Sequence, residues 1–147
     1  MHPYTYRIRF LLIHPNLDFT KTRDVLRNVL GLNPHRLMNF GNDRVSPLGA
    51  KLEGTYFDSR WSFDFHTTDE WEKSEIKSAP EEITDIIEKL TPHKQVFTEL
   101  ANQGCRTEVI ITIGVDSNTS EAFTPYLMRR LSDFDISLAI DLYPPDA

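Results

Sequence analysis

The stretch RTEVIITIGV, from Arg106 to Val115, decides the class of fold because its side chains alternate along the chain. Its apolar side chains fall on one side of a β-strand, and they are Val109, Ile111, Ile113 and Val115. Arg106, Glu108 and Thr112 fall on the other side. A strand covered on both faces carries a continuous apolar run, so this pattern predicts a sheet with helices on one face only.

On either side of this strand, alternating or extended segments occur at 4–13, 36–40, 54–66 and 136–143. Helical spacing of apolar residues occurs at 19–30, 78–103 and 125–134. The order of these elements predicts a single α+β domain over residues 1–147. Its mainly antiparallel sheet has about five strands, with three helices on one face. The first six elements follow the ferredoxin-like order β-α-β-β-α-β, and α-β is added after them.

Capping residues mark the ends of the helices. Asp18 or Thr20 can cap the first helix, and Gly31 is expected to end it in a left-handed conformation. Ser78 and Glu81 form a capping box at the start of the second helix. These signals fix the helix starts more firmly than periodicity alone does.

Three segments break the regular pattern. Pro92 interrupts the second helix, which is therefore either one kinked helix or two helices stacked end to end. The stretch Val45 to Leu52 has no clear period and is predicted to be a loop. Thr67 to Lys77 is charged and irregular, apart from Trp71.

Composition and charge narrow the class of protein. The 147 residues are 39% apolar and 26% charged, with a net charge of −6, as expected of a soluble globular domain. That sign argues against nucleic-acid binding, which needs a basic surface, and it suits a basic protein partner. Cys105 is the only cysteine, which favours a reducing compartment and an inert buried thiol over a nucleophile. Without a signal peptide or an apolar run of about 18 residues, the chain is expected to be cytoplasmic.

Several short pieces occur in the order found in a known family. They are Leu30-Gly31-Leu32-Asn33-Pro34, Gly41, Trp61, Leu90-Thr91-Pro92, Gly104 and the closing Ile140-Asp141-Leu142-Tyr143. In these pieces and their order, the chain resembles a bacterial family of small proteins known only as a domain of unknown function. The chain departs from that pattern at 45–58 and 67–77. The resemblance implies a shared fold and carries no activity with it.

The face of the sheet without helices gathers the charged side chains. Its expected members are Arg7, Arg9, Asp64, His66, Arg106, Glu108, Asp141 and Tyr143. The favoured interpretation is a solvated or partner-binding face held by cross-strand ion pairs, each worth roughly 0.2–1 kcal/mol. The alternative is a catalytic group made of Asp64, His66 and Asp141. An uncovered sheet face is equally able to pair two copies of the chain.

Metal and cofactor chemistry finds no support in the sequence. The five histidines (His2, His14, His35, His66 and His93) lie at no spacing typical of a metal site. No phosphate-binding or dinucleotide-binding glycine motif is present either. We therefore expect neither a metal nor a cofactor.

Trp71 lies within an acidic stretch formed by Asp69, Glu70, Glu72 and Glu75. Two interpretations are equally good: the ring folds back onto the core, or it is an aromatic anchor for a basic partner. Together with the sheet face, this stretch predicts a non-enzymatic protein-binding domain. Its most concrete form is an immunity-type inhibitor of a basic bacterial toxin. The alternative is a small-ligand binder or an enzyme that uses the charged sheet face.

Overall fold

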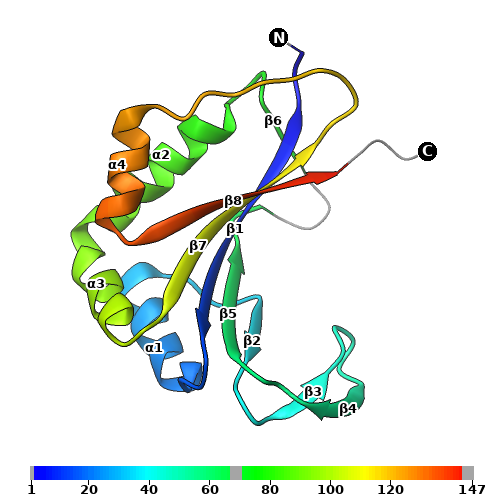
Figure 1. Ribbon diagram of the computed structural model, residues 1–147, viewed down its shortest axis with the longest axis vertical. Helices are drawn as coiled ribbons and strands as arrows, with labels where there is room; N and C mark the ends of the chain where they lie inside the picture. Colours follow the sequence, from blue (N-terminus) through cyan, green and yellow to red (C-terminus); the bar gives the residue numbers. More distant parts are fainter. Residues whose placement is uncertain (1, 67–70, 144–147) are drawn as a thin grey trace. The chain divides into compact units, whose positions relative to one another are not determined.

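The computed structural model describes residues 2–66 and 71–143, so Asp69 and Glu70 lie outside the described residues. Its strands are β1 (Thr5–His14), β2 (Arg36–Met38), β3 (Asp43–Val45), β4 (Lys51–Thr55), β5 (Ser59–Asp64), β6 (Glu72–Lys73), β7 (Arg106–Gly114) and β8 (Ile136–Tyr143). Its helices are α1 (Phe19–Leu30), α2 (Ala79–Leu90), the 3₁₀ turn η1 (Thr91–His93), α3 (Lys94–Asn102) and α4 (Pro125–Asp133). Figure 1 shows these elements along the chain. The predicted α+β class is confirmed.

The strands form a six-stranded sheet and a separate hairpin. The sheet has the order β2-β5-β1-β7-β8, with β6 also paired to β1, and β3 pairs with β4. The chain divides into two compact units, which are the described parts of Met1–Phe10 with Asp64–Ala147, and Leu11–Phe63.

In the first unit, α2, α3 and α4 cover one face of the sheet (Figure 1). Phe97 of α3 connects the layers, because its ring centroid lies 5.7 Å from that of Phe10 in β1 and 5.7 Å from that of Phe134. The buried side chains of this core include Ile8, Ile83, Ile86, Ile87, Val109, Ile111, Leu127 and Leu131. The predicted alternation of β7 is confirmed, since Thr107, Val109, Ile111 and Ile113 are buried.

The edge strand β8 runs parallel to β7, with a register from Thr107↔Ile136 to Gly114↔Tyr143. A parallel pair needs a crossover connection, and α4 supplies it. The sheet is therefore mixed and has six strands, one more than the roughly five that were predicted. The predicted ferredoxin-like order stays a prediction.

The second predicted helix is two helices joined by a 3₁₀ turn. Ser78 accepts a hydrogen bond from the backbone N–H of Glu81, and the Glu81 side chain accepts one in return, so the predicted capping box is confirmed. Pro92 lies inside η1, between α2 and α3.

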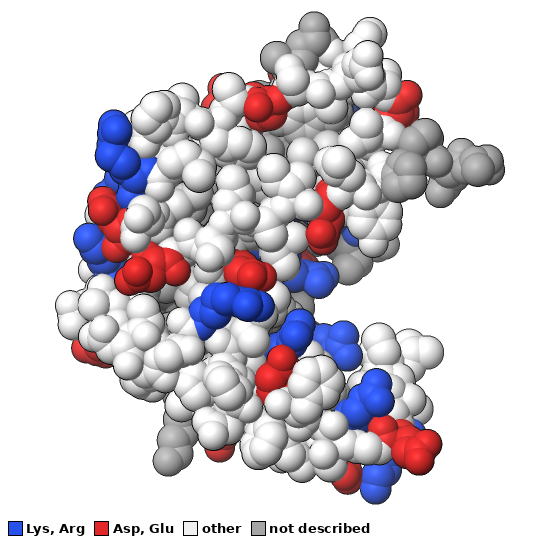
Figure 2. Space-filling model, viewed as in Figure 1, with Lys and Arg blue, Asp and Glu red and all other residues white. Residues whose placement is uncertain are grey.

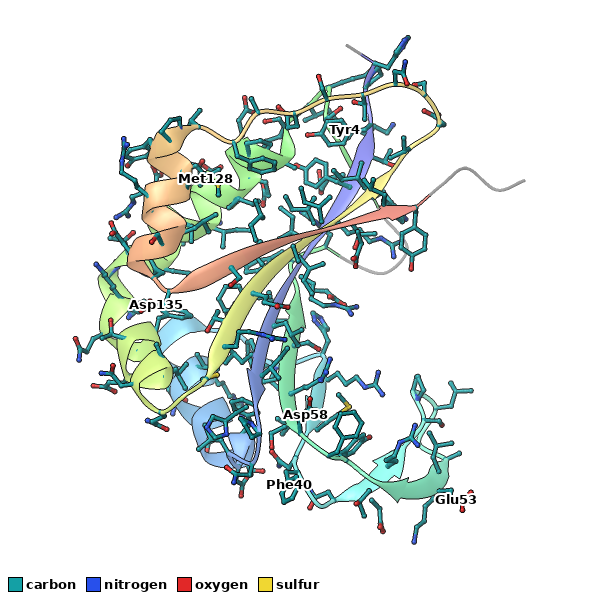
Figure 3. The ribbon with its side chains drawn as sticks, viewed as in Figure 1. Tyr4, Phe40, Glu53, Asp58, Met128 and Asp135 are labelled. Atoms are coloured by element: carbon teal, nitrogen blue, oxygen red, sulfur yellow. The ribbon has the colours of Figure 1, made fainter. Side chains whose placement is uncertain are left out.

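A sharp turn follows α4 at Asp135, which has a φ of 54° and is labelled in Figure 3. This turn brings the chain directly into β8.

The second unit contains α1, β2 and β5. Asp18 caps α1 by accepting a hydrogen bond from the N–H of Thr20, and Gly31 ends the helix with a φ of 67°. β2 pairs antiparallel with β5, so that Leu37 lies opposite the fully buried Trp61. The predicted cap and the left-handed glycine are both confirmed.

Two predictions are correct only in part in the second unit. Of the predicted loop of residues 45–52, residues 46–50 connect β3 to β4, but Val45 and residues 51–52 belong to this hairpin, in which Asp43 lies opposite Thr55 and Val45 opposite Lys51. The predicted strand of residues 54–66 is divided into β4 and β5 by residues 56–58. Every residue of β3 and β4 is exposed, so no apolar face could produce a periodic signal there.

Candidate functional site

Three strands bring a group of polar side chains onto the helix-free face of the first unit. The register of β7 and β8 sets Thr112 opposite Asp141 and Gly114 opposite Tyr143. The arrows of β1 and β7 point in opposite directions (Figure 1), and a β carbon on Gly114 would stand 2.8 Å from the side-chain oxygen of Thr5. The start of β1 therefore lies beside the end of β7, and β8 follows on the other side of β7.

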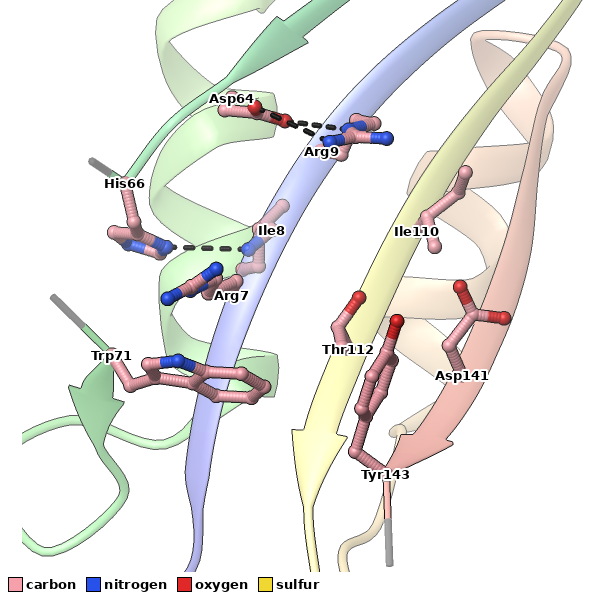
Figure 4. A pocket seen from close by; sticks show the side chains of 10 residues that line it. All are labelled: Arg7, Ile8, Arg9, Asp64, His66, Trp71, Ile110, Thr112, Asp141 and Tyr143. Carbon is pink, nitrogen blue, oxygen red and sulfur yellow. Dashed lines mark hydrogen bonds and ion pairs between the residues drawn. The ribbon is translucent and has the colours of Figure 1, made fainter. Parts of the chain in front are cut away.

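Alternate residues of β1 continue along this face, because successive side chains of a strand point to opposite sides. Arg7 and Arg9 thus share the face with Thr112 and Asp141, while Ile8 is buried between them on the opposite side. Figure 4 shows these side chains around a pocket of about 240 Å³. The pocket is lined by Arg7, Ile8, Arg9, Asp64, His66, Trp71, Ile110, Thr112, Asp141 and Tyr143.

Arg9 forms an ion pair with Asp64 at one end of the pocket. Its Nε donates to one carboxylate oxygen of Asp64 at 2.6 Å, and a terminal nitrogen donates to the other at 3.4 Å (Figure 4). The hydrogen bond to Asp64 is the main reason that the pKa of Arg9 is raised, and the charge of Asp141 adds to it. Because Asp64 is 21% exposed and Arg9 54% exposed, the pair is worth no more than about 1 kcal/mol.

Arg7, Trp71 and Tyr143 form an aromatic cluster at the other end. The guanidinium carbon of Arg7 lies 4.4 Å from the centroid of the Trp71 ring. The rings of Trp71 and Tyr143 meet edge to face, with centroids 6.3 Å apart. Gly114 lies next to this cluster, since a β carbon there would stand at ordinary van der Waals distance, 3.7 Å, from the Trp71 ring. Trp71 therefore lies half-buried on the sheet face and not in the core beneath the helices.

His66 contacts the backbone of β1. Its Nδ1 accepts a hydrogen bond from the N–H of Ile8 at 3.2 Å, and its ring meets that of Tyr6 edge to face at 5.7 Å. Its Nε2 lies 3.9 Å from a carboxylate oxygen of Glu72 and 3.9 Å from one of Glu82. Because Nδ1 of the imidazole already accepts this hydrogen bond, only Nε2 remains for other hydrogen bonds or ion pairs. The side chain is only 8% exposed, which suits a structural role at the rim of the pocket.

Asp141 is an exposed carboxylate on the far wall of the pocket, next to Thr112 and Tyr143 (Figure 4). Among the described residues, no cationic group lies within ion-pair distance of it. Asp64 and Asp141 flank Arg9 on opposite sides in Figure 4. Asp64 makes the ion pair with Arg9, and the charge of Asp141 acts on Arg9 from a greater distance.

The residues predicted to bind a partner do not all meet here. The pocket brings together Arg7, Arg9, Asp64, His66, Trp71 and Asp141. Glu72 lies on β6, which pairs with β1, and is near His66. Glu75 is exposed near Tyr4 and lies away from the pocket. Glu108 lies further along β7, where one of its oxygens is 3.3 Å from Nε of Arg106. The predicted acidic ring around Trp71 is therefore not part of the pocket, in so far as its residues are described.

Sequence reasoning missed four residues that complete the pocket. Tyr143 and Thr112 were assigned to this face but not to the site, and Ile8 and Ile110 were assigned to neither. The alternation of β7 was signal enough for Ile110, because it lies between Glu108 and Thr112. Contact between Trp71 and Tyr143, which lie far apart in the chain, had no local signal.

Within residues 2–66 and 71–143, no group of three side chains could hold a metal ion. In the same part of the chain, no helix combines the length and the apolar character needed to cross a membrane.

No curated protein and no solved structure matches the chain. A family described as a domain of unknown function (DUF4279) matches residues 10–145, which include most of the pocket and all of β7, α4 and β8. This match covers nearly the whole chain, and the chain therefore belongs to the DUF4279 family.

Proposed function

We propose that the chain is a non-enzymatic protein-binding domain, and that the helix-free sheet face of its first unit is the binding surface. The observation that carries this proposal is the cluster of Trp71, Tyr143 and Arg7 around an open pocket. Tryptophan, tyrosine and arginine are the residue types that dominate the energetics of protein interfaces. Here Trp71 contacts both Arg7 and Tyr143, so the aromatic rings need little further ordering to bind.

The contacts of the titratable groups support binding over catalysis. A general base must reach the proton that it abstracts, in or near hydrogen-bond distance. Asp64 is engaged by Arg9, and Nδ1 of His66 is engaged by the backbone of Ile8. No hydrogen bond or ion pair links Asp141 to either of them in the described part of the chain. The arrangement lacks the nucleophile–base contact that covalent catalysis needs.

The net charge of −6 supports a basic partner, which long-range attraction would bring in faster. On the face seen in Figure 2, acidic and basic side chains are interspersed, and neither sign forms a continuous patch. Specific contact then depends on the aromatic cluster and on Glu72 and Glu75 beside it in the chain. The most concrete form of this function is an immunity-type inhibitor of a basic toxin. It would act in the cytoplasm, where Cys105 stays reduced.

The test is affinity capture from the native host, followed by calorimetry with the purified partner. Trp71→Ala is expected to weaken binding at least tenfold, since a buried interface tryptophan costs about 2 kcal/mol or more when truncated. Tyr126→Ala is the matched control, because Tyr126 is an exposed aromatic residue on α4. Equal affinity of wild type and Trp71→Ala, with both chains folded by circular dichroism, would overturn the proposal.

The charge of the partner is tested separately. Glu75→Lys is expected to slow association with a basic partner, and the effect should shrink as salt is added. Glu88→Lys makes the same change in charge at an exposed position of α2 and serves as the control. If both variants slow association equally, only net charge matters and Glu75 lies outside the interface.

A second candidate function is the binding of a small ligand inside the pocket. It is favoured by the volume of about 240 Å³ and by the opposite charges on the two walls, Arg7 and Arg9 on β1 and Asp141 on β8.

A further inference from the structure

We propose that the outer edge of β8 receives an extended segment of a basic protein partner, which pairs with β8 as a further strand of the sheet. The segment would carry apolar side chains next to Ile140 and Leu142, and a lysine or arginine opposite Asp141. This proposal rests on the protein-binding function and deepens it, because it specifies which part of the partner binds and how that part is held.

The backbone of β8 is paired on one side. β8 is the last strand of the sheet, and Figure 4 shows it beyond β7, on the side away from β1. The C=O of Tyr143 accepts a hydrogen bond at 2.9 Å from the N–H of Val115 and therefore points toward β7. Backbone groups of successive strand residues point to alternate sides, so those of Leu138, Ile140 and Leu142 point outward. In the described part of the chain, no strand pairs with them.

Apolar side chains accompany these outward backbone groups. Ile140 is 47% exposed and Leu142 is 66% exposed. The register sets them opposite the buried Ile111 and Ile113, so all four lie on the face that the helices cover. The apolar cover of this face therefore does not reach the end of β8. A strand paired with residues 138–142 would bring its own apolar side chains beside the exposed ones and remove them from water.

Asp141 determines the charge of the segment. It is exposed, and its side chain projects from the opposite, helix-free face, because it lies between Ile140 and Leu142 in the strand. A basic residue directly across from Asp141 forms a favourable cross-strand pair, and an acidic residue there is repelled. The net charge of −6 attracts a basic segment in the same sense. Charge complementarity therefore selects a basic strand over a neutral or acidic one.

A second copy of the chain fits this edge less well than a basic segment does. Two copies related by a twofold axis would pair their β8 strands antiparallel. The registers that cover Ile140 and Leu142 in both copies are centred on or next to Asp141. They bring the two Asp141 carboxylates directly opposite or diagonal to each other, where like charges repel. A lysine or arginine in a different protein replaces this repulsion with attraction.

The probe is a synthetic peptide with blocked ends and the same length as β8, eight residues. It alternates valine with threonine and carries one lysine in place of a central threonine. A second peptide has glutamate in place of the lysine, and a third has the first sequence with every backbone nitrogen methylated. Isothermal calorimetry measures the affinity of each peptide for the wild-type protein.

The lysine peptide is expected to bind the wild type about fivefold or more tightly than the glutamate peptide does. The methylated peptide should bind at least tenfold more weakly than its parent, because it cannot donate backbone hydrogen bonds. Asp141→Asn should remove the preference for lysine, and Asp141→Lys should reverse it. Glu88→Lys, at an exposed position of α2, makes the same change in net charge as Asp141→Lys and should keep the preference.

Two variants at Leu142 test the backbone of the protein. Leu142→Pro removes an N–H that points outward, and proline is tolerated in an edge strand when that side faces solvent. Leu142→Ala removes the same side chain and keeps the N–H. The lysine peptide should therefore bind Leu142→Pro about fivefold or more weakly than Leu142→Ala. Circular dichroism and tryptophan emission show whether both variants keep the fold and the contacts of Trp71.

Three results would overturn the proposal. The first is that no peptide binds at millimolar concentration. The second is that the methylated peptide binds the wild type as tightly as its parent, a result that does not depend on how Leu142→Pro folds. The third is that the wild type alone forms a dimer in sedimentation velocity and Leu142→Pro does not, which would make a second copy the occupant of the edge.

Failure of this proposal is distinguishable from failure of the protein-binding function. The captured partner is measured against Trp71→Ala and Leu142→Pro in parallel. If only Trp71→Ala weakens binding, the sheet face binds the partner and pairing with β8 is overturned. If only Leu142→Pro weakens binding, pairing with β8 is supported and the role of Trp71 is overturned. If neither variant weakens binding, both proposals fail.

Discussion

The phenol oxygen of Tyr4 accepts a hydrogen bond at 3.1 Å from the backbone N–H of Ala79, the first residue of α2. The same hydroxyl donates to a carboxylate oxygen of Glu121 at 2.5 Å. Tyr4 stands near the start of β1 in Figure 3 and is buried. The Tyr4 side chain thus accepts a hydrogen bond from a backbone N–H at the start of α2 that has no acceptor within the helix.

Tyr4→Phe removes this acceptor and leaves the N–H of Ala79 without it. We expect a loss of about 1–2 kcal/mol in the free energy of unfolding, the usual cost of an unsatisfied buried group. Urea unfolding measures it. Tyr56→Phe is the control, since its hydroxyl bonds Val45 in the solvent-facing hairpin and its removal should cost about 0.5 kcal/mol or less. Equal losses in the two variants would contradict the role of Tyr4.

Alkaline pH should destabilise the protein through two buried phenols. Burial is the main cause that raises the pKa of both Tyr4 and Tyr6, with Glu121 adding to the first and Glu82 to the second. Above the ordinary tyrosine pKa of about 10, the unfolded chain releases these protons while the folded chain keeps them. Stability is therefore complete below about pH 10 and falls above it, by up to about 1.4 kcal/mol per pH unit for each phenol.

The measurement is the free energy of unfolding between about pH 9 and pH 11, with the tyrosinate absorbance recorded alongside. Tyr6→Phe should make the alkaline slope shallower than that of the wild type. A slope that is the same in both proteins would show that Tyr6 ionises normally in the folded state.

Gly114→Ala is expected to be destabilising although the backbone there is not left-handed. A β carbon would stand 2.8 Å from Oγ1 of Thr5, which is too close for a real contact. We expect a loss of about 1 kcal/mol on urea unfolding, the lower end of the cost of overpacking. Because Thr5→Ala removes the clashing oxygen, the double variant should recover part of that loss. Strictly additive effects of the two changes would exclude the clash as the cause.

The variants His66→Phe and His66→Asn test whether His66 stabilises the protein through its hydrogen bond with the N–H of Ile8. Phenylalanine leaves the N–H of Ile8 without its acceptor, and we expect a loss of about 1–3 kcal/mol in stability. Asparagine can present a carbonyl oxygen close to the position of Nδ1, so it should restore much of that stability. Thermal and urea unfolding measure both. If asparagine is as damaging as phenylalanine, the hydrogen bond to Ile8 contributes little.

The local signals in the sequence were sufficient wherever the determinant is local. Asp18, Gly31 and Ser78 act within a few residues of their own position, and each cap was predicted correctly. The alternation of β7 also revealed its buried face. The direction of β8 was not predicted, because alternation is the same in parallel and antiparallel strands. The intervening α4 was the available clue, since a parallel neighbour requires a crossover.

The candidate site was predicted only in part for the same reason. Arg7, Arg9, Asp64 and Asp141 lie on strands, and strand period alone assigns them to one face. Trp71 lies outside a long strand, and its contacts with Arg7 and Tyr143 depend on the fold of the whole unit. These contacts could not be predicted from its acidic neighbours in the sequence.

The parallel strand β8 ends the sheet with Ile140, Leu142 and Tyr143 exposed, Leu142 by 66%. In the described part of the chain, no strand pairs with its outer edge. Such an unpaired strand edge is a template for strand addition and aggregation, and natural sheets commonly prevent both with a charged residue at the edge. Asp141 is the only charged side chain in β8, so neutralising it removes that protection too. Light scattering of Asp141→Asn would reveal self-association that the wild-type carboxylate holds back.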